Sequence, residues 1–255
     1  MKSTMIPKGL QELGILSLLN ELEYNSKSVY LTGSWARGTN TSLSDIDLDI
    51  LACEDIPKEI ILGTITPYQS NKIVIDAKIF TPIEFTQLQK GPSHFFFWTR
   101  FQDGLHISGD SLSLKHDYEQ TRRFIEVSMD RMNEAISLVH SGRYLATVLF
   151  LMYESLCGSY FLESYLLNGK RIQYIKEEYL RNHCGNLFSL CRQNYYTHVR
   201  AQFQDSLDWP IRIRFRSDLK MKKDAFQTLK DVIYQVDNHV MNVYNSALRK
   251  IDSIV

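Results

Sequence analysis

The chain has 255 residues, of which 44% are hydrophobic, and its 29 basic residues balance 29 acidic ones. A chain of this length can bury one large core or two smaller ones, and we expect two domains. The neutral total argues against a dedicated electrostatic nucleic-acid binder, and the four cysteines, which form no CxxC pair, indicate neither a disulfide framework nor a structural zinc site.

The first part of the chain alternates between helical and extended patterns. Residues 8–24 predict an amphipathic helix, and because acidic residues interrupt its apolar positions we expect neither a signal peptide nor a membrane anchor. Strands are predicted at 28–32, 45–51 and 72–80, with a glycine-containing turn after the first. We expect an α+β protein with a cytoplasmic location, whose first domain holds a mixed sheet flanked by helices.

The remainder of the chain has a helical pattern. Residues 117–140 carry apolar residues at three- and four-residue spacing, which predicts an amphipathic helix. The run that follows, YLATVLFLMYESLCGSYFLESYLL, is apolar on nearly every side, which is typical of a helix buried centrally in a bundle. Further helices are expected at 171–182, 185–196 and 222–251. We predict one domain over residues 1–114 and an all-α helical bundle over residues 115–255.

Aspartates stand at every other position of the second predicted strand, DIDLDIL. Side chains two residues apart point to the same side of a strand, so Asp45, Asp47 and Asp49 share one face. In the third strand, Asp76 lies on the face opposite the apolar residues. If the two strands are neighbours with their apolar faces on one core, Asp45, Asp47 and Asp76 all point to the same outer side.

Three converging carboxylates offer the oxygen ligands that suit Mg²⁺ or Mn²⁺, and two such ions side by side serve in-line attack on a phosphate. Gly33 and Ser34 follow the first strand and would present backbone N–H groups and a hydroxyl to a phosphate. Gly38 lets the backbone turn without a side chain in the way. A phosphate cradle beside a metal site indicates a nucleoside triphosphate.

The string G-S-x-x-x-G, ten residues between Ser34 and Asp45, the sequence S-D-I-D-L and a third acid on a later strand resemble the active-site pattern of the polymerase-β-type nucleotidyltransferases. The resemblance implies that Gly33 and Ser34 hold the triphosphate. It also implies that Asp45 and Asp47 bind both metal ions. By the same resemblance, Asp76 completes the second metal site and helps to deprotonate the attacking hydroxyl.

Asp49 departs from the family pattern, which usually has a small or apolar residue at that position. We expect it to pair with a lysine, Lys72 or Lys78, and to tolerate replacement best of the three aspartates on its strand. Arg37 and Arg100 are further candidates for contact with the nucleotide phosphates. The aromatic cluster that precedes Arg100 is expected to be core.

The total length, and the order of a catalytic domain before a helical bundle, are similar to those of the aminoglycoside and lincosamide nucleotidyltransferases. In that group an acid from the helical domain can serve as general base for the acceptor hydroxyl. Glu154 is the candidate here, because its helical neighbours are apolar or small and desolvation favours its protonated form. The alternative is a buried glutamate paired with an arginine or a tyrosine.

A second resemblance is to the minimal nucleotidyltransferases of toxin and antitoxin systems, which act with helical HEPN proteins. Arg192 and His198 match the spacing of the HEPN ribonuclease motif, although such a pair also arises by chance. The basic residues between 212 and 223 could contact a triphosphate or an RNA acceptor. A solvated edge strand, protected by its charges, is the alternative.

The sequence thus predicts a metal-dependent nucleotidyltransferase that moves a nucleoside monophosphate from ATP, or another nucleoside triphosphate, to an acceptor hydroxyl and releases pyrophosphate. The expected cofactors are two Mg²⁺ ions, with Mn²⁺ as a substitute. The expected acceptor is a small molecule such as an aminoglycoside or lincosamide antibiotic. The alternatives are a tRNA or protein acceptor, or a nucleotide-binding module without catalysis. We expect no membrane contact, and a homodimer by similarity to the antibiotic enzymes.

Overall fold

The chain divides into two compact units, Met1–Asp117 and Tyr118–Val255, in the computed structural model. The structure describes residues 6–40, 44–70, 73–91, 94–112, 114–142, 144–169, 176–194 and 223–255. The domain assignment at residues 114 and 115, with a catalytic role for the first part, stays a prediction.

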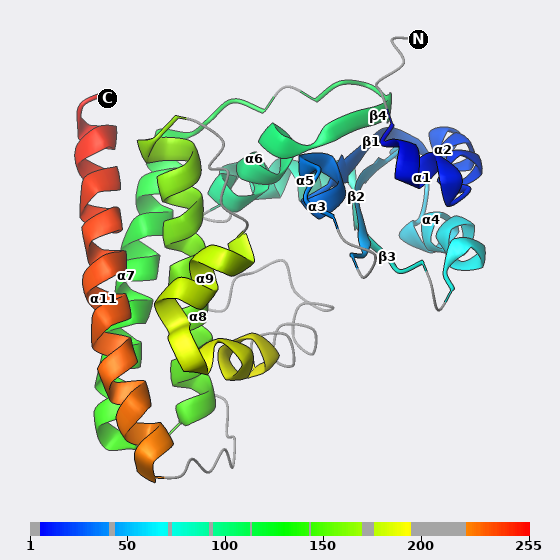
Figure 1. The fold of residues 1–255 in the computed structure, drawn as a ribbon. Coiled ribbons are helices and arrows are strands. Elements are labelled where there is room, and N and C mark those ends of the chain that lie inside the picture. The colour runs from blue at the N-terminus through cyan, green and yellow to red at the C-terminus, as the bar shows by residue number, and fades with distance from the viewer. Residues whose placement is uncertain are drawn as a thin grey trace. The chain divides into compact units, whose positions relative to one another are not determined.

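A four-stranded sheet forms the centre of the first unit (Figure 1). Its strands are β1 (Ser26–Thr32), β2 (Ile46–Ala52), β3 (Ile75–Phe80) and β4 (Leu105–Gly109), in the order β3-β2-β1-β4. β1 is antiparallel to both β2 and β4, whereas β2 and β3 are parallel. The predicted mixed sheet is therefore confirmed, with one edge strand, β4, that the sequence analysis did not identify.

Helices cover both faces of this sheet (Figure 1). They are α1 (Lys8–Glu12), α2 (Ile15–Glu23), α3 (Gly33–Arg37), α4 (Lys58–Ile65), η1 (Thr66–Tyr68), α5 (Pro82–Lys90) and α6 (His94–Asp103). The predicted first helix is broken into α1 and α2 because Gly14 adopts a left-handed conformation, with φ of 73°. α5 begins with a capping box in which the Thr81 hydroxyl accepts a hydrogen bond from the Glu84 N–H.

The two faces of the sheet have different cores because alternate residues of each strand point to opposite sides. On one face, aliphatic residues of α1, α2 and α4 pack on Leu48, Ile50 and their neighbours. On the other face, Leu51 packs among aromatic residues of β1, β3, α5 and α6, which are Tyr30, Phe80, Phe85, Phe97 and Phe101. This second face also carries the aspartates of β2, so the side on which they lie is covered by α5 and α6 for part of its length.

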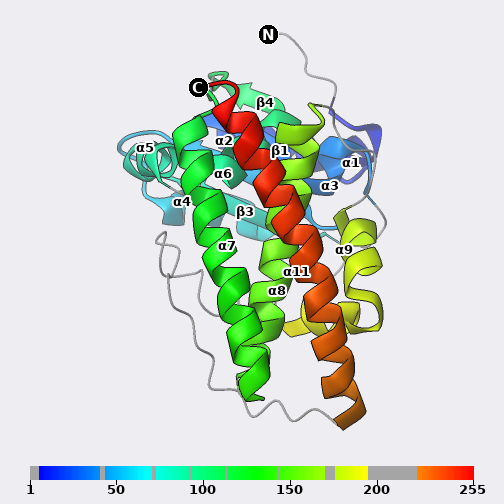
Figure 2. The same ribbon diagram turned by 90° about the vertical axis from the view of Figure 1, so that its left-hand side faces the viewer.

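The part of the second unit that the structure describes is helical, as predicted. Its helices are α7 (Tyr118–Ser141), α8 (Leu145–Phe161), the π-helical segment η2 (Leu162–Leu167), α9 (Lys176–Cys184), η3 (Gly185–Leu187) and α11 (Lys223–Asp252). Helical residues also follow η3 at 188–194. α7, α8 and α11 pack against one another along much of their length (Figure 2).

The segment Leu145–Leu167, formed by α8 and η2, is the one helix among the described residues that is long and apolar enough to cross a membrane, with a mean hydropathy of 1.5. Within this segment, 94% of an apolar stretch of 18 residues is buried inside the protein. Every residue of α8 up to Tyr160 is buried. The prediction of a centrally buried helix is therefore confirmed.

Two isoleucines offer a test of the aliphatic core. Ile50 on β2 is fully buried, whereas Ile83 on α5 is 72% exposed. We expect Ile50→Ala to lower the free energy of unfolding by about 3 kcal/mol, because it removes buried methyl groups and leaves a cavity. Ile83→Ala, the matched control, should change it by less than about 0.5 kcal/mol. Urea unfolding followed by tryptophan fluorescence measures both, and equal effects would contradict the burial of Ile50.

Candidate active site

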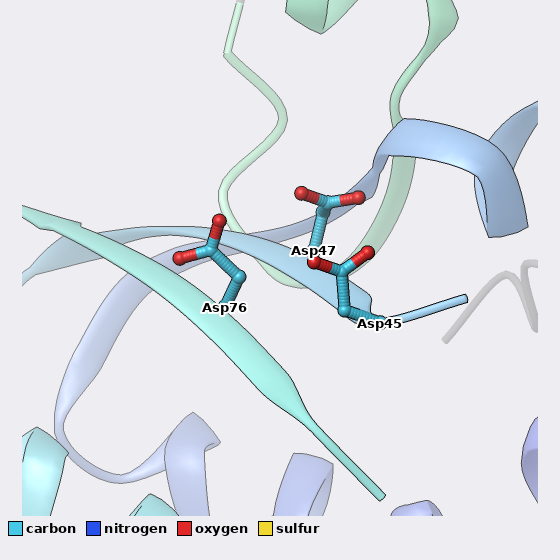
Figure 3. A group of neighbouring side chains, drawn as sticks. All are labelled: Asp45, Asp47 and Asp76. Carbon is cyan, nitrogen blue, oxygen red and sulfur yellow. The ribbon is translucent and has the colours of Figure 1, made fainter. Parts of the chain in front are cut away.

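The parallel pairing of β2 with β3 brings three carboxylates together. Asp47 lies directly opposite Asp76 in this pairing, and Asp45 stands just before β2. One ligand oxygen from each of the three residues lies within 4.8 Å of the other two. Figure 3 shows the three carboxyl groups on the same side of the two strands. The structure thus groups the three acids that the alternating pattern singled out.

The carboxyl group of Asp47 is half-buried within this cluster. Partial burial raises the pKa of Asp47 to about 6; the positive charge of Arg100 opposes the shift, and the negative charges of Asp45 and Asp76 add to it. The ionised form of Asp47 is therefore incompletely compensated by the protein. A bound cation would supply the missing positive charge.

Gly33, the first residue of α3, approaches the cluster more closely than any other residue type could. Its φ is 67°, and a Cβ atom placed on it would lie 1.7 Å from Asp47 Oδ2. A side chain here would force the Asp47 carboxylate to move, and the left-handed conformation also disfavours one. The turn at Gly33, which was predicted to bind phosphate, therefore lies directly against Asp47, a predicted metal ligand.

The N-terminus of α3 has no side-chain cap. The N-cap residue Thr32 makes no hydrogen bond to the helix backbone, and its hydroxyl instead accepts a hydrogen bond from Arg100. The first N–H groups of a helix have no partner within the helix. Ser34 is half-buried at this end of α3, whereas Arg37 at the other end is exposed. Contacts of these residues with a nucleotide stay predictions.

The structure corrects the expected partner of Asp49. Its side chain is fully buried, and its two oxygens accept hydrogen bonds from Nε and Nη2 of Arg100, each at 2.8 Å. The partner is therefore Arg100 and not Lys78, which lies opposite Asp49 on β3; Lys72 lies outside the described residues. Breaking an ion pair whose carboxylate is fully buried is costly. The expectation that Asp49 tolerates replacement best of the three aspartates stays a prediction.

Glu154, the predicted general base, lies in the interior of the helical unit. Its Oε1 lies 3.0 Å from Arg131 Nη1, and its side chain is 7% exposed. Burial raises the pKa of Glu154 to about 7, although Arg131 opposes the shift. Because a base must contact its substrate, this placement agrees with the alternative reading, a buried glutamate paired with an arginine.

The other features singled out in the second unit stay predictions. Arg192 forms an ion pair with Glu177 at 2.9 Å, and both side chains are about half exposed. His198 and residues 212–222 of the basic stretch lie outside the described residues.

Two residues near the carboxylates had no assigned role in the reaction. Thr32 lies opposite Asp47 in the pairing of β1 with β2. Its position directly before Gly33 in the sequence was the signal that could have marked it as a site residue. Lys78 follows Asp76 by two residues and so lies on the same face of β3. The neighbouring positive charge of Arg100 is the main cause that lowers the pKa of Lys78, to about 8; the residue itself is exposed on β3.

Comparison with known proteins agrees with this geometry. Residues 14–94 match the family model described as a nucleotidyltransferase domain, and this range contains Gly33 and all three clustered acids. The match confirms the predicted resemblance and the class of enzyme. No curated protein matches the sequence. Among solved structures, the chain is similar to spectinomycin adenyltransferase AAD(9) from Enterococcus faecialis with ATP and spectinomycin, at 14% identity and a TM-score of 0.46, over 92% of this chain and 100% of that one.

A pair of glycines tests the contact between α3 and β2. Gly33 and Gly38 have nearly equal φ angles, 67° and 69°, but a Cβ atom at Gly38 would meet nothing within 4 Å. Both Gly→Ala variants should lose about 1–2 kcal/mol of stability to backbone strain. Only Gly33→Ala should also displace Asp47, and we expect it to lower nucleotidyl transfer by about a hundredfold or more. Equal losses of activity in the two variants would show that the contact with Asp47 is unimportant.

The raised pKa of Glu154 predicts a pH-dependent stability. The folded protein holds the proton of Glu154 up to about pH 7, whereas the unfolded chain releases it near pH 4.3. The contribution is therefore present at low pH and is lost as the pH rises toward 7, on the order of 3 kcal/mol in total.

Glu154→Gln, which cannot ionise, should remove this decline. Chemical unfolding at several pH values, on the wild type and on this variant, measures the difference, and parallel profiles would contradict the prediction. The variant should keep its nucleotidyl transfer, since the side chain is buried against Arg131.

Proposed function

We propose that this nucleotidyltransferase moves a nucleoside monophosphate from ATP to a hydroxyl group of a small molecule and releases pyrophosphate. The observation that carries the proposal is the cluster of Asp45, Asp47 and Asp76, with ligand oxygens within 4.8 Å of one another, against the backbone of Gly33. Such a cluster beside a helix N-terminus combines ligands for a divalent cation with donors for a phosphate.

The residues present fit Mg²⁺ or Mn²⁺. Carboxylate oxygens are the ligands that these ions prefer. Partial burial, with the neighbouring acids, raises the pKa of Asp47, so a bound cation would stabilise its ionised form. We assign Asp45 and Asp47 to both metal ions and Asp76 to the second. The ions would supply positive charge to the phosphate oxygens as the bond to the leaving group breaks.

The remaining roles fall to the protein's own groups. Asp76 is exposed on β3 and could accept the proton of the attacking hydroxyl, which the buried Glu154 could not do without a rearrangement of its helices. Ser34 and the N-terminal N–H groups of α3 would hold the departing phosphates. Positioning and neutralisation of charge would provide most of the rate enhancement.

The acceptor is proposed to be a small molecule such as an aminoglycoside or a lincosamide antibiotic. The proposal rests on the order of the two units, a nucleotidyltransferase domain followed by a helical unit, which resembles that of the antibiotic enzymes. A cytoplasmic location and a homodimer belong to the same proposal.

Replacement of the two β2 acids tests the metal site. Asp45→Asn and Asp47→Asn should each lower magnesium-dependent pyrophosphate release by at least about a thousandfold, because charge neutralisation by the ions is lost. The variants should fold, since removing like charges relieves repulsion in the cluster. Asp55→Asn, at an exposed acid of the same unit, is the matched control and should keep full activity. Wild-type release rates in the Asp45→Asn, Asp47→Asn double variant would refute the mechanism.

A labelling experiment tests the acceptor. The protein is incubated with ATP labelled at the α-phosphate and with separate pools of antibiotics, tRNA and cell protein. We expect label on a small molecule. Label on tRNA or protein alone would exclude the small-molecule acceptor, and saturable ATP binding without pyrophosphate release would indicate a nucleotide-binding module.

A further inference from the structure

The ion pair between Asp49 and Arg100 connects three elements of the first unit. Arg100 comes from α6 and Asp49 from β2, and both oxygens of Asp49 are engaged by the guanidinium at 2.8 Å. Arg100 Nη2 also donates to the hydroxyl of Thr32, at the end of β1, at 3.1 Å. A planar guanidinium held at two edges by fixed acceptors has little freedom to rotate.

These contacts leave part of the guanidinium available. Of its five N–H groups, the one on Nε and the two on Nη2 account for the bonds to Asp49 and Thr32. Nη1 makes no hydrogen bond within the described parts of the chain. The Arg100 side chain is 28% exposed, whereas that of Asp49 is fully buried. The guanidinium is therefore held by three hydrogen bonds and keeps two donors, both on Nη1.

The position of Arg100 relates it to the carboxylate cluster. Its acceptor Thr32 lies opposite Asp47 in the sheet and directly precedes the Gly33 turn. Its charge acts on both Asp47 and Asp76. The positive charge of Arg100 is thus close enough to act on two of the residues that would bind the metal ions.

Stability alone gives a weak reason for burying Asp49. Its strand neighbour Leu51 packs in the aromatic core of that face, where an apolar residue would suit the position. A buried ion pair is seldom more stable than well-packed apolar residues of similar volume, because both charges lose their hydration. Fixing the orientation of the arginine is a role that an apolar residue could not perform.

We propose that Asp49 is a positioning residue that acts through Arg100, holding the guanidinium so that its Nη1 edge binds a phosphate of the nucleoside triphosphate beside the Asp45, Asp47 and Asp76 cluster. This inference rests on the proposed function, since it concerns the triphosphate of that reaction. Arg100 contacts the substrate, and Thr32 aligns the same guanidinium from β1.

Inorganic tripolyphosphate with Mg²⁺ is the probe, and its dissociation constant is measured by calorimetry without any turnover. Asp49→Asn, which keeps the shape and removes the charge, should weaken binding about tenfold, as should Arg100→Gln, because a charge-assisted contact is misaligned or lost. Thr32→Val should weaken it about threefold. Lys58→Gln, which breaks the Lys58–Glu84 ion pair of the same unit, is the matched control and should bind as the wild type does.

A double-mutant cycle separates positioning from a structural effect. If Asp49 acts through Arg100, Asp49→Asn should cause no further loss of binding in the Arg100→Gln background. Tripolyphosphate binding by Asp49→Asn equal to that of the wild type, or an equal loss in both backgrounds, would overturn the proposal. Should Asp49→Asn fail to fold, unchanged dissociation constants in both Thr32→Val and Arg100→Lys would overturn it.

The two proposals can fail separately. Wild-type protein that binds tripolyphosphate in an Asp49-dependent manner but never releases pyrophosphate from ATP would refute the proposed reaction and leave the positioning role intact. Wild-type protein that does not bind tripolyphosphate with Mg²⁺ would refute both.

Discussion

The parallel pairing of β2 with β3 is the constraint on which the candidate site depends. It sets Asp47 directly opposite Asp76, and a shift of one residue would turn Asp76 toward the aliphatic core on the other face. That core fixes the register, because Ile75 on β3 is buried there with Leu48 and Ile50 of β2. The site is therefore specified by the apolar residues that alternate with its acids.

Burial and the neighbouring acids Asp45 and Asp76 disfavour the ionised form of Asp47, and nearby positive charges offset this only in part. The pKa of Asp47 stays raised despite the positive charges of Arg100 and Lys78. Arg100 forms hydrogen bonds with Asp49. Its positive charge therefore acts on Asp49 as well as on Asp47 and Asp76. Sites that store such repulsion are typically stabilised by the ligand they bind. Burial and the neighbouring acids together raise the pKa of Asp47, and a bound divalent cation would supply the positive charge that its ionised form lacks.

Local patterns in the sequence were sufficient for some features and not for others. The period-two alternation around Asp47 predicted β2, and the all-round apolar run predicted the burial of α8, since both depend on neighbours in the chain. The Asp49–Arg100 pair joins residues 51 positions apart, and no local pattern encodes the packing of α6 on the sheet. β4 is short and its residues are half-buried or exposed, so its alternation is weak. The break at Gly14 was not predicted, because a glycine inside a helical pattern does not by itself reveal a left-handed backbone.

Binding of Mn²⁺, followed by electron paramagnetic resonance in the presence of a non-hydrolysable ATP analogue, tests the central claim most directly. The claim is that Asp45, Asp47 and Asp76 form a divalent-cation site for a nucleoside triphosphate. It predicts saturable Mn²⁺ binding that Mg²⁺ displaces and that Asp47→Asn abolishes, with the analogue increasing the number of bound ions. Mn²⁺ bound equally by the wild type and by Asp47→Asn, with or without the analogue, would contradict it.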